Sequence, residues 1–139
     1  MEIFFLALAD KTRLRLLNLM CEDEIRVSFL VDVLGENQPK ISRHLAYLRS
    51  AGIVEARRDG KWIHYKIIEP TDNFTAQMLR HTLVWLESQE QMQDEYKKLV
   101  KFRDSFDTSI VMTHAPQTNV FAKTNTGNPK NREMETFLL

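Results

Sequence analysis

The segment from Asn37 to Gly52 constrains the fold of this chain most, because it shows a helix start, an apolar face and a helix stop in order. Asn37 is a favourable N-cap, and Pro39 falls in the first turn, where a missing N–H costs no hydrogen bond. Gly52 ends the helix. Apolar residues recur at spacings of four and three, which predicts one buried face made of Ile41, Leu45 and Leu48.

The rest of this helix surface is polar and cationic. A DNA recognition helix presents its first two turns to base edges and phosphates in the major groove. The pattern therefore predicts DNA contacts from Gln38, Lys40, Ser42, Arg43, His44 and Tyr47. An ordinary amphipathic helix with a solvated cationic face would show the same pattern, so the flanking sequence has to decide.

A second short helix is expected just upstream. Ser28 is a plausible N-cap for it, Leu30, Val31 and Leu34 supply an apolar face, and Gly35 stops it. Two short helices joined by about three residues that include Gly are typical of a helix-turn-helix. A further helix from Lys11 to Met20 precedes them, with Asp10 as its N-cap, and its spacing places Arg13, Arg15 and Asn18 on the outer face.

The period changes after Gly52. Two runs rich in β-branched and aromatic residues, 53–57 and 62–68, flank the sequence Arg58-Asp59-Gly60-Lys61. Asp-Gly between such runs predicts a tight hairpin with a type I′ turn. A basic hairpin after a recognition helix is typical of a wing, and we expect its cations to contact the DNA backbone. Those cations are Arg57, Arg58 and Lys61; a merely solvated hairpin tip is the alternative.

Residues 73–106 contain neither Pro nor Gly and predict one long helix with an apolar seam. Such a helix needs a partner surface, and the apolar segment 2–8 must be covered either by the domain core or by a second subunit. The economical partner is a second copy of the chain in a C2 dimer, which suits a palindromic operator in double-stranded DNA. We therefore expect a DNA-binding and dimerisation domain over 1–107, followed by a polar tail over 108–139 that is either mobile or an ordered coil on the body.

Charge and composition narrow the class of protein. The chain has 139 residues and no net charge, but residues 38–66 contain seven Lys or Arg and two acids, a local pattern that favours a nucleic-acid footprint. A lone cysteine, Cys21, fits a reducing compartment, and no run is long enough for a membrane span, so a cytoplasmic location is expected. No set of nucleophile, base and orienting residue is recognisable, so we do not expect an enzyme.

The chain resembles the ArsR/SmtB family of bacterial winged-helix repressors over roughly residues 4–86. The most specific matches are Leu8-Ala9-Asp10-Lys11-Thr12-Arg13-Leu14, the Ile41-Ser42-Arg43-His44-Leu45 core and the Asp59-Gly60 wing. The resemblance implies a mainly α fold with a small β-hairpin wing (α+β), a winged helix-turn-helix with a long C-terminal dimerisation helix. It also implies a homodimer built through residues 2–8 and 73–106.

The metal sites of that family are not matched here. Arg26 and Ser28 stand where the resemblance implies cysteine thiolates, and soft metals and arsenite need thiolates. Of the family's interfacial site only Asp72 remains, and one carboxylate does not hold zinc. We therefore expect no metal site and no cofactor, and we expect Cys21 to be an ordinary thiol.

The leading hypothesis is thus a dimeric transcriptional repressor that binds a palindromic operator, with helix 37–52 in the major groove and wing 57–62 on the backbone. The alternative is a winged-helix protein-interaction module without specific DNA binding. The sequence leaves three possibilities for the inducer. It is a metal at an unusual site contributed by both subunits, an organic ligand in the dimer cleft around Phe74, Met78 and Trp85, or there is no inducer.

Overall fold

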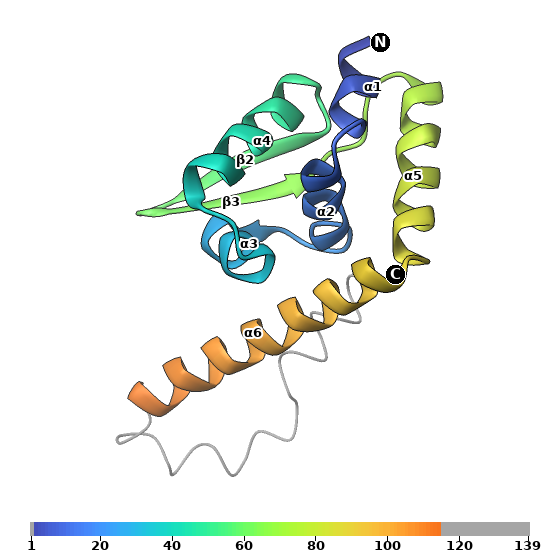
Figure 1. Cartoon of the computed structure of the whole chain (residues 1–139). Helices are drawn as coiled ribbons and strands as arrows, with labels where there is room; N and C mark the ends of the chain where they lie inside the picture. Colours follow the sequence, from blue (N-terminus) through green and yellow to red (C-terminus); the bar gives the residue numbers. More distant parts are fainter. Residues whose placement is uncertain (1, 115–139) are drawn as a thin grey trace, which may run out of the picture. The chain divides into compact units, whose positions relative to one another are not determined.

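The computed structural model describes residues 2–114, which are mainly helical with one small antiparallel sheet (Figure 1). The predicted fold class, a winged helix-turn-helix, is confirmed. The elements in chain order are α1 (Glu2–Leu8), α2 (Lys11–Leu19), β1 (Ile25–Arg26), α3 (Val27–Leu34), α4 (Gln38–Ser50), β2 (Val54–Asp59), β3 (Trp62–Ile67), α5 (Asn73–Glu87) and α6 (Glu90–His114). By internal contacts the chain divides near residue 102, and the candidate interface and the cavity described below lie within residues 2–102.

α4 has the ends that its sequence predicts. Asn37 Oδ1 accepts a hydrogen bond of 2.9 Å from the Lys40 amide, which satisfies a donor of the first turn. At the other end the Gly52 amide donates to Arg49 O and the Ile53 amide donates to Leu48 O, at 3.0 and 3.1 Å. This pair of bonds is a Schellman motif, which needs a left-handed residue, and Gly52 supplies it with φ of 73°.

The helix that precedes α4 begins differently from the prediction. Its N-cap is Arg26, without a side-chain hydrogen bond, so Ser28 lies inside the first turn and the expected Ser28 cap is wrong. The reason is β1, a two-residue strand that the sequence pattern did not predict. Ile25 pairs with Tyr65 and Arg26 pairs with His64, so the chain enters α3 directly from a strand.

The sheet has the strand order β1-β3-β2, and β2 and β3 form the predicted hairpin. Asp59 pairs with Trp62, which leaves Gly60 and Lys61 as the two turn residues. Gly60 has φ of 60°, while no residue other than glycine has positive φ within the described chain. A single positive φ at the first turn position is the pattern of a type II′ turn, so the predicted type I′ turn is wrong.

The predicted single helix over 73–106 is also wrong, because the chain breaks between α5 and α6. The Ser88 and Gln89 amides donate to carbonyls three residues back, and the Ser88 hydroxyl donates to Trp85 O at 2.6 Å, so the helix end is satisfied without Gly or Pro. The break lets Met92 pack on α2, where its carbonyl accepts a 2.8 Å bond from Asn18 Nδ2. α6 then runs past the predicted helix end at residue 106 to His114.

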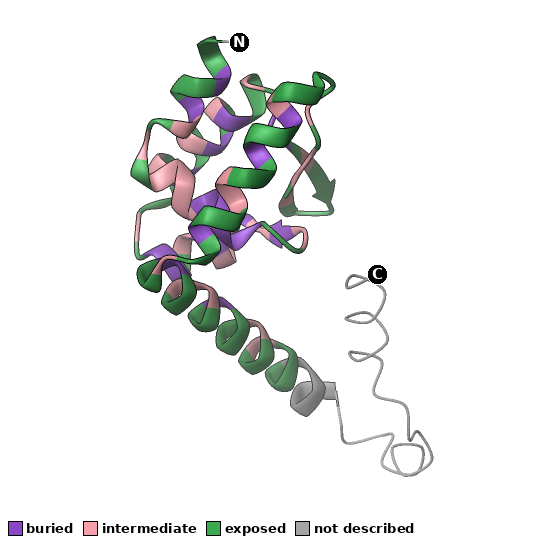
Figure 2. Ribbon diagram, turned by 90° about the vertical axis from the view of Figure 1, so that its right-hand side faces the viewer, coloured by how far each residue is buried: buried purple, intermediate pink, exposed green. Residues whose placement is uncertain are grey.

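The core lies between α2, α3, α4 and the start of the sheet. Figure 2 shows that buried residues gather on the inner sides of these elements, while most of α6 is exposed. Two polar residues of α2 turn inward, against the prediction that they face out. Asn18 is only 4% exposed, and Arg15 forms an ion pair with Glu95 of α6. Both side chains bind α6, a partner far away in sequence, which the local spacing of α2 does not reveal.

Two helices expose apolar side chains that the described chain does not cover. α1 buries Phe4 and Ala7 but exposes Ile3, Phe5 and Leu6. α5 exposes a stripe that includes Phe74 at 70% and Trp85 at 55%. These are the segments expected to form the dimer. Among residues 2–114, no helix is long and apolar enough to cross a bilayer. Of the expected tail, residues 108–114 continue α6 and residues 115–139 lie outside the described part.

Candidate nucleic-acid interface

The first turns of α4 present polar side chains to solvent. Gln38, Ser42 and Arg43 are exposed, and Arg43 makes no ion pair or hydrogen bond with any residue from 2 to 114. Lys40 is half-buried and forms an ion pair of 3.0 Å with Glu36, one helical turn before it. α4 itself contains no acidic residue. The exposed face of these first turns therefore offers the unconstrained Arg43 guanidinium, together with the Ser42 hydroxyl and the Gln38 amide.

His44 and Tyr47 lie on the side of α4 that turns toward α1 and α2. Arg13 Nη1 lies 3.2 Å from His44 Nδ1, and the Arg13 guanidinium carbon lies 4.2 Å from the centre of the Tyr47 ring. Both residues are half-buried. The structure thus places these two predicted contact residues against Arg13, whereas Gln38, Ser42 and Arg43 face solvent.

Arg13 connects the recognition helix to the N-terminal helix. Its Nε and Nη2 donate to Ala7 O and Leu6 O at 2.8 and 2.9 Å, so it satisfies carbonyls at the C-terminal end of α1. An arginine can only donate hydrogen bonds, so His44 Nδ1 accepts and neutral His44 carries its proton on Nε2. The spacing in the sequence predicts an outer position for Arg13, because periodicity gives the face of a helix but not the partner that this face meets.

This arrangement favours the neutral form of His44. Burial lowers the pKa of His44, and the positive charges of Arg13, Arg43 and Lys40 lower it further, while the carboxylate of Asp10 opposes them. Asp10 Oδ1 lies 3.8 Å from His44 Nδ1 and also caps α2 by accepting from the Arg13 amide. The Asp10 cap is confirmed, and it lies beside the contact between Arg13 and His44.

The cations of the wing differ in how they are held. Arg57 donates to both carboxylate oxygens of Glu24 at 2.6 and 3.2 Å, and this bond raises the pKa of Arg57. Arg58 Nε donates to Gly60 O at 3.2 Å, and Lys61 Nζ lies 5.4 Å from the Trp62 ring centre. All three side chains are exposed. Arg58 and Lys61 are therefore the wing cations without a carboxylate partner in the described part of the chain.

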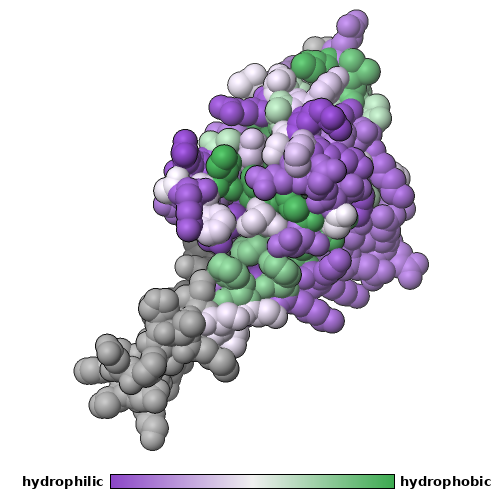
Figure 3. Space-filling view, turned by 60° about the vertical axis from the view of Figure 1, so that its left-hand side comes forward, coloured by the Kyte–Doolittle hydropathy of each residue, from purple (hydrophilic) through white to green (hydrophobic). Residues whose placement is uncertain are grey.

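Figure 3 turns the hairpin end of Figure 1 toward the viewer, and this face is largely hydrophilic with a few apolar patches. α4 and the hairpin are successive elements joined by the Schellman turn, and they pack on each other, since Leu48, Ile53 and Val54 share the same core. The helix and the wing are thus fixed to one scaffold, which a two-part contact with a duplex requires.

Arg26, which stands where the family resemblance implies a cysteine, makes packing contacts in this structure. The Arg26 guanidinium carbon lies 4.3 Å from the Trp62 ring centre and 5.2 Å from that of Phe29, so it packs between α3 and the hairpin.

Burial and the carboxylates of Glu22 and Glu87 raise the pKa of Cys21 to about 11, so its thiol is protonated at neutral pH. Within residues 2–114, no group of three or more His, Cys, Asp or Glu side chains is placed to hold a metal ion.

Comparison with known proteins gives consistent matches. Residues 10–56 match the family model described as bacterial regulatory protein, arsR family. The chain is 37% identical over 108 residues to the arsenical resistance operon repressor of Escherichia coli K12, a match that covers 77% of this chain and 91% of that protein.

Two solved structures share the fold. The transcriptional repressor BigR from Xylella fastidiosa aligns with a TM-score of 0.54 and 33% identity, over 63% of this chain and 83% of that one. The homodimeric winged helix-turn-helix DNA-binding domain Mb0332 from Mycobacterium bovis aligns with a TM-score of 0.51 and 30% identity, over 64% and 83% of the two chains.

Proposed function

Because this chain belongs to the ArsR family of bacterial regulatory proteins, we propose that it is a dimeric transcriptional repressor that binds a palindromic operator. The observation that carries the proposal is the exposed face of α4, where Arg43 stands without a partner among the described residues beside Ser42 and Gln38. The alternative, a protein-interaction module, has no comparable support, since the relatives are DNA-binding regulators and repressors. A cytoplasmic location follows from this proposal.

The residues of the interface take different roles in this proposal. Arg43 contacts a guanine edge in the major groove through two parallel hydrogen bonds, with Ser42 and Gln38 beside it. Lys40 contributes charge toward a phosphate. His44 and Tyr47 hold α4 against Arg13 and contact DNA less directly than the sequence pattern predicts. Their contacts with Arg13 fix the angle at which α4 enters the groove.

The wing contributes a non-specific electrostatic contact. Arg58 and Lys61 approach backbone phosphates directly, because neither has a carboxylate to give up within the described chain. Arg57 must give up its ion pairs with Glu24 and Asp59 before it can bind a phosphate, which reduces its net contribution to DNA affinity. Wing contacts of this kind position a protein on the duplex but carry little sequence information.

The dimer places two copies of α4 on one operator. The exposed apolar side chains of α1 and α5, among them Phe5, Leu6, Phe74 and Trp85, supply the surface that the second copy covers. Such a C2 interface uses the same patch on both protomers, so the operator has matching two-fold symmetry.

The test compares two variants on two duplexes. Arg43→Ala should weaken binding to the DNA upstream of the protein's own gene by about 1–3 kcal/mol and leave binding to a shuffled duplex nearly unchanged. Lys61→Ala should weaken both duplexes alike and reduce the slope of affinity against salt by about one ion. Mobility-shift titrations at several salt concentrations measure both effects. Lys101→Ala, a charge change in α6 outside the interface, is the matched control. Identical behaviour of the two variants on both duplexes would refute these roles.

A further inference from the structure

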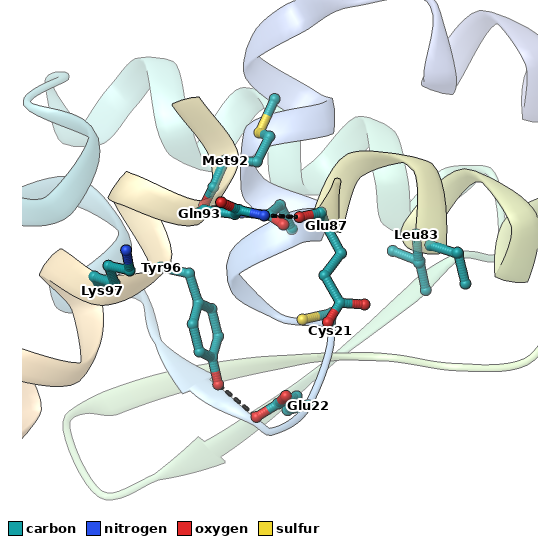
Figure 4. Close-up of a pocket in the computed structure, with 10 residues that line it drawn as sticks. Cys21, Glu22, Leu83, Glu87, Met92, Gln93, Tyr96 and Lys97 are labelled. Atoms are coloured by element: carbon teal, nitrogen blue, oxygen red, sulfur yellow. Dashed lines mark hydrogen bonds between the residues drawn. The ribbon is translucent and has the colours of Figure 1, made fainter. Parts of the chain in front are cut away.

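A cavity of about 380 Å³ lies between the end of α2, the second half of α5 and the first turns of α6 (Figure 4). Ligand sites in proteins have volumes of about 300–1,000 Å³, so this space suits a molecule of one ring. Figure 4 shows labelled side chains around it from the turn after α2, from α5 and from α6. It lies within the first unit of the chain and apart from the face of α4 and the wing.

The cavity is lined by both apolar and charged side chains. Leu83, Val84 and Met92 supply apolar surface, and the Tyr96 ring stands beside them. The acidic side chains are Glu22 and Glu87, and Lys97 is the cationic residue among those that line the space. Tyr96 Oη donates to Glu22 Oε2 at 2.6 Å, which fixes the ring and the carboxylate together and leaves the other carboxylate oxygen for a ligand.

The lining carries more negative than positive charge, because the carboxylates of Glu22 and Glu87 outnumber the ammonium group of Lys97. Cys21 lies beside both carboxylates, and burial together with these two charges raises its pKa to about 11. The cavity therefore favours a positively charged group. A single neutral thiol with two carboxylates does not make a soft-metal site, and the apolar walls do not suit a hydrated ion.

We propose that this cavity binds a small organic monocation, an ammonium group carried on an apolar body of about one ring. The ammonium lies between the carboxylates of Glu22 and Glu87, where it gains charge-assisted hydrogen bonds. The apolar body packs on Leu83 and Met92, and the face of Tyr96 adds a cation–π contribution.

The cavity residues Leu83 and Glu87 lie on a different side of α5 from the apolar stripe. Helix geometry turns about 100° per residue, so Leu83 and Glu87, each two residues from Trp85, project about 200° away from it. Phe74 and Met78 lie on the Trp85 side by the same spacing. The proposal therefore concerns a site on the opposite side of α5 from that stripe, and it is independent of DNA binding.

The test uses three probes of one shape and three charges: benzylammonium, benzyl alcohol and benzoate. Each is titrated into the full-length, isotopically labelled chain while amide chemical shifts are followed. Benzylammonium should shift amides in 18–22, 83–87 and 92–97 and saturate at millimolar concentration or below. Benzyl alcohol should bind about fivefold more weakly, as expected for the loss of a partly exposed ion pair, and benzoate more weakly still.

Two charge-neutralising variants separate the carboxylates from general surface charge. Glu87→Gln should weaken benzylammonium about fivefold and leave benzyl alcohol unchanged, and Glu22→Gln should do the same. The matched control is Glu90→Gln, an exposed acid of α6 that does not line the cavity, and it should change neither probe. Equal binding of all three probes, shifts confined to other segments, no saturable shift, or loss of affinity in Glu90→Gln alone would overturn the proposal.

Discussion

Removing Arg15 should destabilise the fold more than removing any exposed cation. Arg15 Nε donates to Glu95 Oε1 at 2.7 Å and Nη2 donates to Leu34 O at 3.4 Å, so one guanidinium joins α2 to α6 and to the end of α3. The two side chains are only 17% and 12% exposed. Glu95 Oε2 is buried and accepts no hydrogen bond within the described residues. Arg15→Ala therefore leaves a shielded carboxylate without its cationic partner.

The size of the effect follows from the degree of burial. Breaking a fully buried ion pair costs about 3–5 kcal/mol, whereas an exposed pair contributes about 1 kcal/mol or less. The Arg15–Glu95 pair lies between these limits in burial. Gln91 Nε2 also donates to Glu95 Oε1, at 3.2 Å, and this bond does not depend on Arg15, so it reduces the cost of the substitution. We expect Arg15→Ala to lower the free energy of unfolding by about 2 kcal/mol. The double variant Arg15→Met/Glu95→Leu should recover most of that loss, because it removes the stranded charge and refills the space.

Urea denaturation at one fixed protomer concentration measures these changes, since the stability of a dimer depends on concentration. Arg80→Ala is the control, because its pair with Glu69 is exposed on both sides and should contribute less than about 1 kcal/mol. If Arg15→Ala cost no more than Arg80→Ala, or if the double variant were the least stable of all, the assignment of a shielded, structural ion pair would be refuted.

Three further perturbations test other parts of the structure. The folded state holds the pKa of His44 below its usual value, so the unfolded chain takes up the proton first as pH falls. The stability that neutral His44 gives the fold is therefore complete above about pH 6.5 and is lost as pH falls below that value. Thermal unfolding from about pH 7 to pH 5 should show a smaller loss of stability in His44→Asn. Gly60→Ala should cost about 1–2 kcal/mol of unfolding free energy, because φ is 60° and no neighbour lies within 4 Å of an added Cβ, so the cost is backbone strain alone; an unchanged denaturation midpoint would contradict this. Trp85→Glu should convert the dimer to a monomer in sedimentation experiments and weaken operator binding, and a persistent dimer would show that the α5 stripe is not the interface.

The parts of the fold that the sequence predicts are those fixed by neighbouring residues. The ends of α4 depend on Asn37, Pro39 and Gly52, each of which acts within one turn of its own position. The hairpin follows from Gly60 and the two flanking β-rich runs. The turn type was missed because the same Asp-Gly pair fits two registers, and only the pairing of Asp59 with Trp62 shows that Asp59 belongs to the strand.

The features that the sequence did not predict depend on distant partners. β1 has two residues, too few for any period, and exists because β3 lies beside it. The break at Ser88 has no Gly or Pro, and it accompanies the packing of Met92 against Asn18. Arg13 belongs to the same class: its position on α2 is visible in the sequence, but its bonds to α1 and His44 are not.

The candidate interface shows the same division. Spacing alone places Ser42 and Arg43 on the outer face of α4, where the structure has them exposed. The same spacing cannot tell that Glu24 comes within 2.6 Å of Arg57, because the two residues meet only through the pairing of the strands. The roles of these residues on DNA stay predictions, to be tested by the variants above.

The central claim is that α4 recognises a specific sequence. The most direct measurement is a titration of the unmodified chain on the DNA upstream of its own gene, in parallel with a shuffled duplex of the same composition, at one physiological salt concentration. The account predicts that the upstream DNA binds at least about 10³-fold more tightly, with two protomers on each duplex. Equal affinity for both duplexes, or one protomer on each site, would contradict it.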